Sequence, residues 1–248
     1  MTVRPAACAL RKVWAASQSP ALPARRGDAM EGRLACFTQE QRQRLTAARV
    51  GIAGTGGLGS NAAMMLARSG VGSLILIDCD IVEASNLNRQ HFMPRHLGRP
   101  KAEALAEQIR ELDASIAVDV RVLRLDASNT PALLPLADIW VEAMDDARTK
   151  ALFTALALRS GRPVIAASGM GGYGGRPMRR RVLGGSGEGL PTGSPERAVP
   201  RAFAAVVGDF HADIASHPPL APRVIQCAAM QADAVLEWLF TGKVEPLL

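Results

Sequence analysis

The sequence predicts an α/β fold with a Rossmann-like, doubly wound and mostly parallel sheet, additional C-terminal strands and a final packing helix. Short apolar segments alternate with longer amphipathic ones along most of the chain, an order typical of parallel strands joined by crossover helices. A glycine-rich turn at 54–59 follows the first apolar segment, and Asp78 ends the second. Together these observations predict parallel strands with helices on both faces.

The first elements follow from local pattern. Residues 37–46 predict a short capped helix leading into the sheet, and 50–53 are short and apolar, as a buried parallel strand is. The small residues of 60–70 predict the first crossover helix, and 73–77 the next strand. Residues 98–113 are amphipathic with a proline near their start, which predicts a helix.

The middle of the chain repeats this order. Residues 116–126 alternate apolar and polar side chains, as a half-exposed strand does, and 138–143 predict another strand. Residues 147–161 predict a helix closed by its terminal glycine, and 163–169 the strand after it.

The amino-acid composition changes beyond Gly169. Residues 169–201 are rich in Gly, Pro and Arg, and a long segment of this kind in a compact domain is usually functional or disordered. Within it, 178–183 (MRRRVL) predict a short strand. The neighbouring arginines either bind an acidic partner or lie in a loop exposed to solvent. Residues 202–210 predict a further strand, and the apolar segment 220–242 predicts the final helix.

Length and charge bound the domain organisation. A chain of 248 residues favours one large domain, at 30–248, after an arginine- and proline-rich extension at 1–29 that we expect to be disordered. The extension has five basic residues and one acidic residue, so it carries +4 of the net charge of +6. Because the rest of the chain is nearly neutral, we expect no nucleic-acid partner.

Cysteine and hydropathy patterns exclude other classes. The four cysteines (Cys8, Cys36, Cys79 and Cys227) form no C-x-x-C pair, so neither a structural zinc site nor a disulfide framework is expected, and a cytoplasmic location fits. No apolar run reaches the roughly 18 residues of a membrane span, so no membrane association is expected.

The glycine turn predicts a nucleotide site. Gly54, Gly56 and Gly59 have the G-x-G-x-x-G spacing, with Gly57 added. This spacing permits a tight turn, a close approach of the backbone to phosphate, and packing of the following helix. Asp78 stands where an acid reaches a ribose. Because NAD and ATP both carry adenosine ribose, this unit alone leaves the two open.

Three further residues favour a triphosphate. Arg89 and Lys101 follow the second strand on the same edge of the sheet, and a charge pair with phosphate at ~4 Å is worth about 4 kcal/mol at an effective dielectric of ~20. Asp145 ends another strand there, and Mg²⁺ prefers a few protein oxygens together with phosphate oxygens. The alternatives are a surface arginine, a solvated helix lysine, and a cap formed by Asp145 and Asp146 for the next helix.

The combined motifs resemble the ThiF/MoeB superfamily of ubiquitin-activating-type adenylyltransferases, and in particular its shorter ThiF-type branch tied to thiamine biosynthesis. The resemblance covers about residues 35–242. The motifs that carry it are GTGGLGS (54–60), LILIDCD (74–80), SNLNRQ (85–90), GRPKAEAL (98–105) and EAMDD (142–146).

The resemblance implies adenylylation of the C-terminal Gly-Gly carboxylate of a small ubiquitin-fold sulfur carrier protein, with ATP and Mg²⁺ as cofactors. It implies that Asp78 holds the ribose, that Asn86, Arg89 and Lys101 contact the phosphates, and that Asp145 holds Mg²⁺. A homodimer is also implied, for which Arg33 is the candidate cross-subunit residue.

This chain departs from the family pattern at three points. The C-x-x-C pairs of zinc-binding relatives are absent, residues 169–201 hold no cysteine for a covalent relay, and Asp146 replaces the usual asparagine. Three alternatives to a thiamine role stay open: a molybdopterin-carrier or tRNA-modifying member of the superfamily, and a nicotinamide-dependent oxidoreductase.

Overall fold

The computed structural model describes residues 32–184, 202–211 and 217–247. The chain divides into two compact units, residues 1–36 and 37–248, and the second holds the sheet and its helices. The extension predicted at 1–29 lies outside the described residues, so its disorder and the domain boundary at residue 30 stay predictions.

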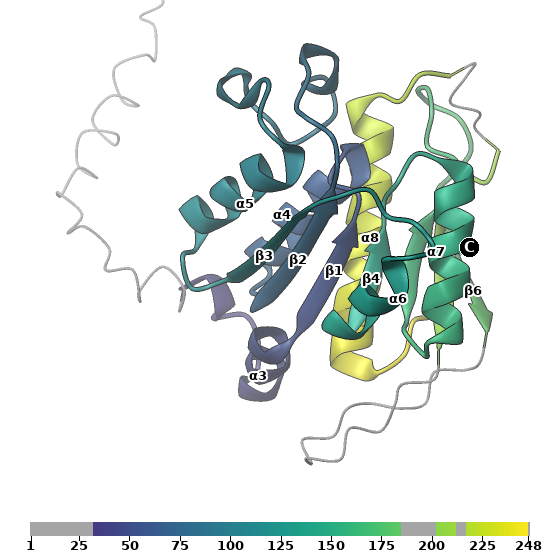
Figure 1. Cartoon of the computed structure of the whole chain (residues 1–248). Coiled ribbons are helices and arrows are strands. Elements are labelled where there is room, and N and C mark those ends of the chain that lie inside the picture. Colours follow the sequence, from purple (N-terminus) through teal and green to yellow (C-terminus); the bar gives the residue numbers. More distant parts are fainter. Residues whose placement is uncertain (1–31, 185–201, 212–216, 248) are drawn as a thin grey trace, which may run out of the picture. The chain divides into compact units, whose positions relative to one another are not determined.

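The described residues of the second unit form a seven-stranded sheet in the order β3-β2-β1-β4-β5-β7-β6 (Figure 1). Neighbouring strands from β3 to β7 pair in parallel, and β6 pairs antiparallel with β7 at the edge. The predicted Rossmann-like fold with added C-terminal strands is thereby confirmed. The strands are β1 Arg49–Ala53, β2 Ser73–Asp78, β3 Ala117–Val122, β4 Ile139–Glu142, β5 Val164–Ala167, β6 Arg179–Gly184 and β7 Phe203–Gly208.

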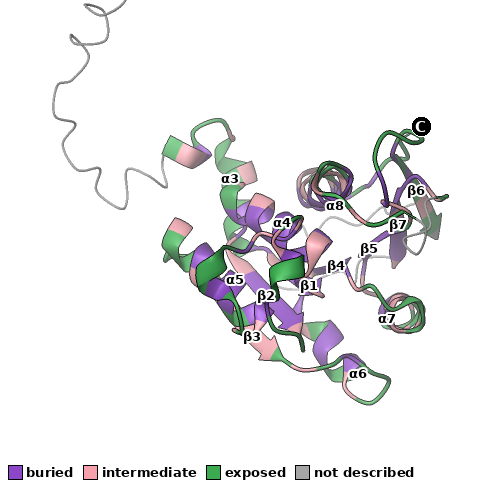
Figure 2. Ribbon diagram, turned by 90° about the horizontal axis from the view of Figure 1, so that it is seen from above, coloured by how far each residue is buried: buried purple, intermediate pink, exposed green. Residues whose placement is uncertain are grey.

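Helices cover both faces of the sheet, as Figure 2 shows. Helices α4, α5 and α8 enclose the larger apolar core with one face, and α6 and α7 enclose a smaller core around Trp140 and Phe153 on the other. The helices are α3 Gln39–Ala47, α4 Gly57–Arg68, α5 Lys101–Leu112, α6 Thr130–Leu133, α7 Ala147–Arg159 and α8 Ala221–Thr241. The two-faced arrangement follows from right-handed crossovers between parallel strands.

Most expected elements lie within a few residues of their predicted bounds, and two differences are informative. The strand expected at 116–126 ends at Val122, because the chain turns there and Leu123 and Leu125 line a cavity instead. The short helix α6 was not expected, since Thr130–Leu133 is too brief to show helical periodicity.

The arginine-rich segment is divided by the pleat of β6. Arg180 is buried, and its guanidinium pairs with Asp233 and Glu237 of α8 and donates to the Glu245 carbonyl oxygen at 2.6 Å. Arg181 is exposed on the opposite side of the strand. The alternative of a solvated loop is therefore wrong for Arg180.

None of the helices in the described part of the chain combines the length and apolar character of a membrane-crossing segment.

Candidate nucleotide-binding site

A cavity of about 560 Å³ opens at the carboxyl ends of β1, β2 and β4. The strand order reverses between β1 and β4, and ligands of open α/β sheets bind at such switch points. The lining includes Gly54, Gly56 and Gly57 of the turn together with residues from β2, α5, α7 and α8. A second depression, of about 720 Å³, lies along α5 and β3. Its Arg99 and Glu107 form an ion pair with each other, so these two charges are already matched without a ligand.

The glycine turn is shaped by steric exclusion. Gly54 has φ of 91°, a left-handed conformation that side chains disfavour, and a Cβ there would lie 2.9 Å from the Ala143 carbonyl oxygen. A Cβ on Gly59 would lie 1.8 Å from the Gly54 carbonyl oxygen, so α4 can approach the turn only without one. Helix α4 begins at Gly57, and its first N–H groups and dipole favour an anion in the cavity. Gly59 packs behind the turn and does not line the cavity.

Asp78 ends β2 and contacts the glycine turn at the wall of the cavity. Its Oδ2 accepts hydrogen bonds from the Thr55 N–H at 2.6 Å and the Thr55 hydroxyl at 3.0 Å. Its Oδ1 accepts from the Asp80 N–H at 2.9 Å. These bonds fix the carboxylate at the cavity wall, where it can also accept hydroxyl protons from a ribose.

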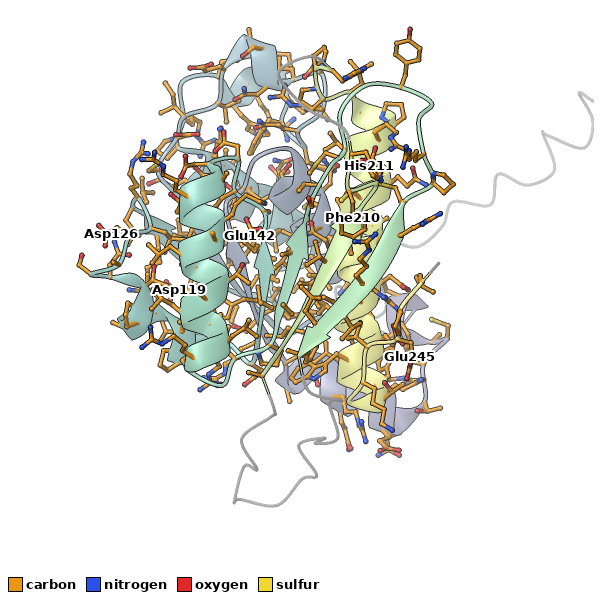
Figure 3. The ribbon with its side chains drawn as sticks, turned by 90° about the vertical axis from the view of Figure 1, so that its right-hand side faces the viewer. Asp119, Asp126, Glu142, Phe210, His211 and Glu245 are labelled. Atoms are coloured by element: carbon orange, nitrogen blue, oxygen red, sulfur yellow. The ribbon has the colours of Figure 1, made fainter. Side chains whose placement is uncertain are left out.

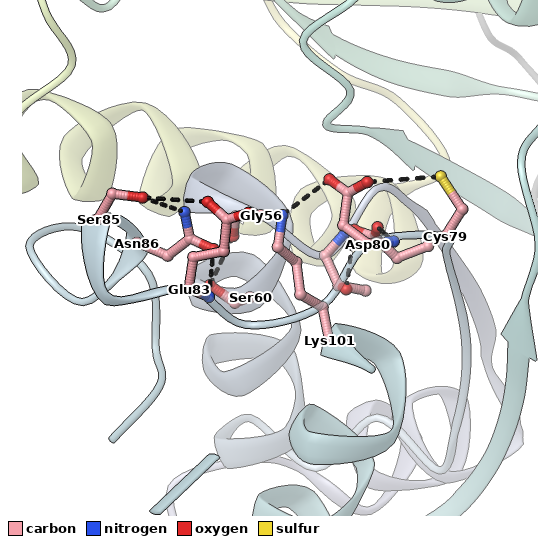
Figure 4. Close-up of polar contacts among 10 residues, drawn as sticks. Gly56, Ser60, Cys79, Asp80, Glu83, Ser85, Asn86 and Lys101 are labelled. Atoms are coloured by element: carbon pink, nitrogen blue, oxygen red, sulfur yellow. Dashed lines mark hydrogen bonds and ion pairs between the residues drawn. The ribbon is translucent and has the colours of Figure 1, made fainter. Parts of the chain in front are cut away.

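Lys101, the first residue of α5, is not a solvated lysine. Its side chain is only 9% exposed, and Nζ lies 2.9 Å from Asp80 Oδ2 (Figure 4). The hydrogen bond from Lys101 holds the pKa of the Asp80 carboxyl below its ordinary value. The ammonium group lines the cavity, where the triphosphate expectation requires a cation.

Arg89 and Asn86 occupy one turn but have different surroundings. Arg89 lines the cavity, and its Nη1 donates to the Ser85 carbonyl oxygen at 3.0 Å and to Asn88 Oδ1 at 2.8 Å. Asn86 is buried outside the lining, and its Oδ1 accepts the Glu83 N–H at 3.1 Å (Figure 4). The structure therefore places Asn86 where it shapes the turn that presents Arg89, and its predicted contact with phosphate stays a prediction.

The adjacent acids Asp145 and Asp146 have separate positions. Asp146 is the N-cap of α7, and its Oδ2 accepts from the Thr149 N–H and hydroxyl, each at 2.7 Å. These bonds lower the pKa of the Asp146 carboxyl. Asp145 is exposed and lines the cavity, and its carboxylate has no hydrogen bond or ion pair with the described residues. The capping alternative thus holds for Asp146 alone.

The carboxylates suit a hard cation. Asp78 and Asp80 offer oxygen atoms within 4.8 Å of each other, and Asp145 lines the same cavity. Carboxylate oxygens are ligands that Mg²⁺ accepts. Cys79 lies between the first two acids, but burial and the nearby Asp80 raise the pKa of its thiol, which disfavours the thiolate as a ligand.

One pair at the site was missed from the sequence. Glu142, the last residue of β4, is fully buried, and its Oε2 lies 2.7 Å from Nζ of Lys150 in α7. Lys150 lines the cavity, whereas Glu142 lies behind it. An acid inside an otherwise apolar strand was the available signal, because a buried carboxylate needs a partner.

Curated relatives match about half or more of the chain. The sulfur carrier protein ThiS adenylyltransferase of Bacillus subtilis is 31% identical over 209 residues, which cover 83% of this chain and 58% of that protein. The SAMP-activating enzyme E1 of Haloferax volcanii is 37% identical over 127 residues, which cover 51% and 47%. The matched stretch is therefore under two thirds of the length of either relative.

Solved structures share the fold. The Escherichia coli tRNA N6-threonylcarbamoyladenosine dehydratase TcdA, in complex with ATP, aligns with a TM-score of 0.72 at 22% identity and covers 86% of this chain and 94% of its own. Escherichia coli MccB with ATP aligns with a TM-score of 0.59 at 24% identity, over 81% and 58%. The ThiF family model matches residues 30–246. This chain, with its glycine turn and cavity at the switch point of the sheet, belongs to the ThiF family.

Proposed function

We propose that this protein is an adenylyltransferase that activates the C-terminal Gly-Gly carboxylate of a small ubiquitin-fold sulfur carrier protein at the expense of ATP. The observation that carries the proposal is the convergence of Arg89, Lys101 and Asp145 on the cavity formed by the glycine turn. Two cations and a carboxylate beside a helix N-terminus suit a metal-bound triphosphate better than a nicotinamide. The named activities of the B. subtilis and H. volcanii relatives support it.

The reaction requires positioning and charge stabilisation. A carboxylate oxygen of the carrier attacks the α-phosphorus of ATP, and the bond from that phosphorus to the α–β bridging oxygen breaks. The bond's electron pair leaves with pyrophosphate, so the products are the carrier acyl-adenylate and pyrophosphate without any protein nucleophile. Arg89 and Lys101 stabilise negative charge on the phosphates, and Asp78 orients the ribose.

Magnesium fits the donor set. Asp145 would hold Mg²⁺, which would neutralise charge on the phosphate oxygens when bound. Asp145 lies between β4 and α7, whereas Lys101 begins α5, and both line the cavity. Cation side chains and the metal-binding acid then approach the triphosphate from different elements.

A ThiS-like carrier in thiazole synthesis is the substrate that we propose first. The B. subtilis relative named for that carrier matches 83% of this chain, more than the H. volcanii protein does. Purified carriers ending in Gly-Gly, assayed one at a time for ATP–pyrophosphate exchange, separate the thiamine role from a molybdopterin role. Binding of NAD in preference to ATP would instead indicate the oxidoreductase.

The experiment that tests this function replaces Asp145 with Asn, which removes the charge of the side chain and keeps its shape. We expect carrier-dependent ATP–pyrophosphate exchange to fall at least about a hundredfold, with an unchanged melting temperature. Asp119→Asn is the matched control, because Asp119 lies on β3 and pairs with Arg121 outside the cavity. Exchange that survives in Asp145→Asn would refute the metal-binding role, and a wild-type protein inactive with every Gly-Gly carrier would refute the function.

We further propose a homodimer, which sedimentation of the full chain tests directly. A monomer at the concentrations where exchange is active would exclude any contribution of Arg33 from a second copy.

A further inference from the structure

Glu142 lies inside the protein (Figure 3) and pairs with Lys150, which lines the cavity. Glu142 Oε2 contacts Lys150 Nζ at 2.7 Å, and Oε1 accepts the Met144 N–H at 2.8 Å. Burial raises the pKa of the Glu142 carboxyl, and the bonds from Lys150 and the backbone oppose that rise. A buried pair of this kind gives little net stability compared with apolar residues, so its presence calls for another reason.

The pair holds one peptide segment from both sides. Lys150 Nζ also donates to the Met144 carbonyl oxygen at 3.1 Å. Glu142 thus binds the N–H of Met144 while Lys150 binds its carbonyl, and both contacts act on the residue directly before Asp145. The exposed Asp145 side chain makes no hydrogen bond or ion pair with the described residues, so we infer that its orientation depends on the backbone that precedes it.

The pair rests on a fixed platform. Gln231 of α8 is fully buried, and its Nε2 donates to the Glu142 carbonyl oxygen at 2.9 Å and to the Ile165 carbonyl oxygen at 3.1 Å. This side chain ties β4 to β5 from the face opposite α7. The Met144 segment is therefore connected to both layers of helices through Glu142.

We propose that the Glu142–Lys150 pair is a positioning device that clamps the Met144 peptide and thereby directs the Asp145 carboxylate into the nucleotide cavity. This inference rests on the proposed function, in which Asp145 holds the metal. Lys150 acts through Met144 and not by contact with the phosphates. Glu142 does not line the cavity, so it acts through the groups that it binds.

The test uses variants that leave no buried charge alone. The double variant Glu142→Gln/Lys150→Met replaces both ions with neutral groups of similar size, and we expect it to fold. The single variant Lys150→Arg keeps a cationic donor, so we expect it to retain most of the function that the double variant loses. Lys243→Met, a change at an exposed lysine outside the cavity, is the matched control.

Two readouts do not depend on turnover. We expect amide hydrogen exchange of residues 143–146 to accelerate at least about tenfold in the double variant, because the clamp on their backbone is lost. We also expect the Mg²⁺ concentration for half-maximal binding of a fluorescent ATP analogue to rise at least about threefold, with metal-free binding unchanged. Carrier-dependent exchange should fall at least about tenfold, since small misplacements of catalytic groups are costly.

Every outcome either supports or overturns the positioning role of the pair. A double variant with wild-type hydrogen exchange and Mg²⁺ dependence overturns the inference. Weakened metal-free binding of the analogue with an unchanged Mg²⁺ dependence also overturns it, because Lys150 would then be a phosphate ligand. If the wild-type protein activates no carrier, the proposed function fails, and the Mg²⁺ dependence of analogue binding still supports or overturns the positioning role.

Discussion

Replacing Lys101 with Met tests the triphosphate assignment most directly. Methionine keeps an unbranched apolar stem for this largely buried side chain and removes the ammonium group. In the structure that charge is neutralised by Asp80, whose Oδ2 lies 2.9 Å away. We expect bound triphosphate to share or replace Asp80 as the partner of Lys101, so the variant should bind ATP more weakly.

The magnitude follows from the geometry. A charge pair at ~4 Å contributes about 4 kcal/mol at an effective dielectric of ~20. Lys101 exchanges one anion for another when ATP binds, and the Asp80 side chain is 53% exposed, so we take about half of that value. A loss of about 2 kcal/mol corresponds to a roughly 30-fold rise in Kd for ATP. The loss for AMP should be smaller, because AMP lacks the β- and γ-phosphates.

Fluorescence titration with an ATP analogue, competed by ATP or AMP, measures these constants. The assay is run at two salt concentrations, because screening should weaken wild-type binding more than binding by the variant. Lys243→Met is the control for loss of a lysine charge. If Lys101→Met binds ATP within about threefold of wild type, or if AMP binding suffers equally, the assignment of Lys101 to the triphosphate is refuted.

Three predictions concern the scaffold. Gly59→Ala should lower the free energy of unfolding by about 3 kcal/mol or more, because its Cβ would lie 1.8 Å from the Gly54 carbonyl oxygen. Calorimetry that shows no loss of stability would contradict this packing. Burial raises the pKa of Cys227 to about 12, so its thiol should resist alkylation at pH 8 until the protein unfolds, as mass spectrometry can check. Asp146→Ala should lower the melting temperature at pH 7 through loss of the bond to Thr149. Because folding lowers the pKa of Asp146, that stabilisation is present above pH 3.8 and is lost as the pH falls through the folded-state pKa. A deficit that does not shrink as the pH falls below 3.8 would contradict it.

The candidate site was predictable to the extent that it lies at strand ends. Parallel strands place their carboxyl ends on one edge, so Asp78 after β2 and Asp145 after β4 had to approach the glycine turn. The sequence also predicted Arg89 and Lys101 on this edge, and all four residues line the cavity. Asn86 does not line the cavity, because its side chain forms a hydrogen bond within its own turn. The spacing of the motif gives no information about that hydrogen bond.

Burial of polar side chains was not predictable. Arg180 shares its segment with exposed arginines, yet the pleat of β6 turns it toward acids that lie more than fifty residues later in α8. Glu142 meets Lys150 only because β4 and α7 pack with the correct rotation. Such pairings depend on contacts between elements, and periodicity within one element carries no information about them.

By itself the sequence determined the order of strands and helices, the glycine turn and the edge of the sheet where polar residues gather, because these follow from local periodicity and from the connectivity of parallel strands. Only the tertiary structure decided which of two adjacent acids caps α7 and which faces the cavity. It also decided which cations are buried and paired. The reason is physical: the energy of a charged group depends on its solvent exposure and its partners, and packing between distant segments sets both.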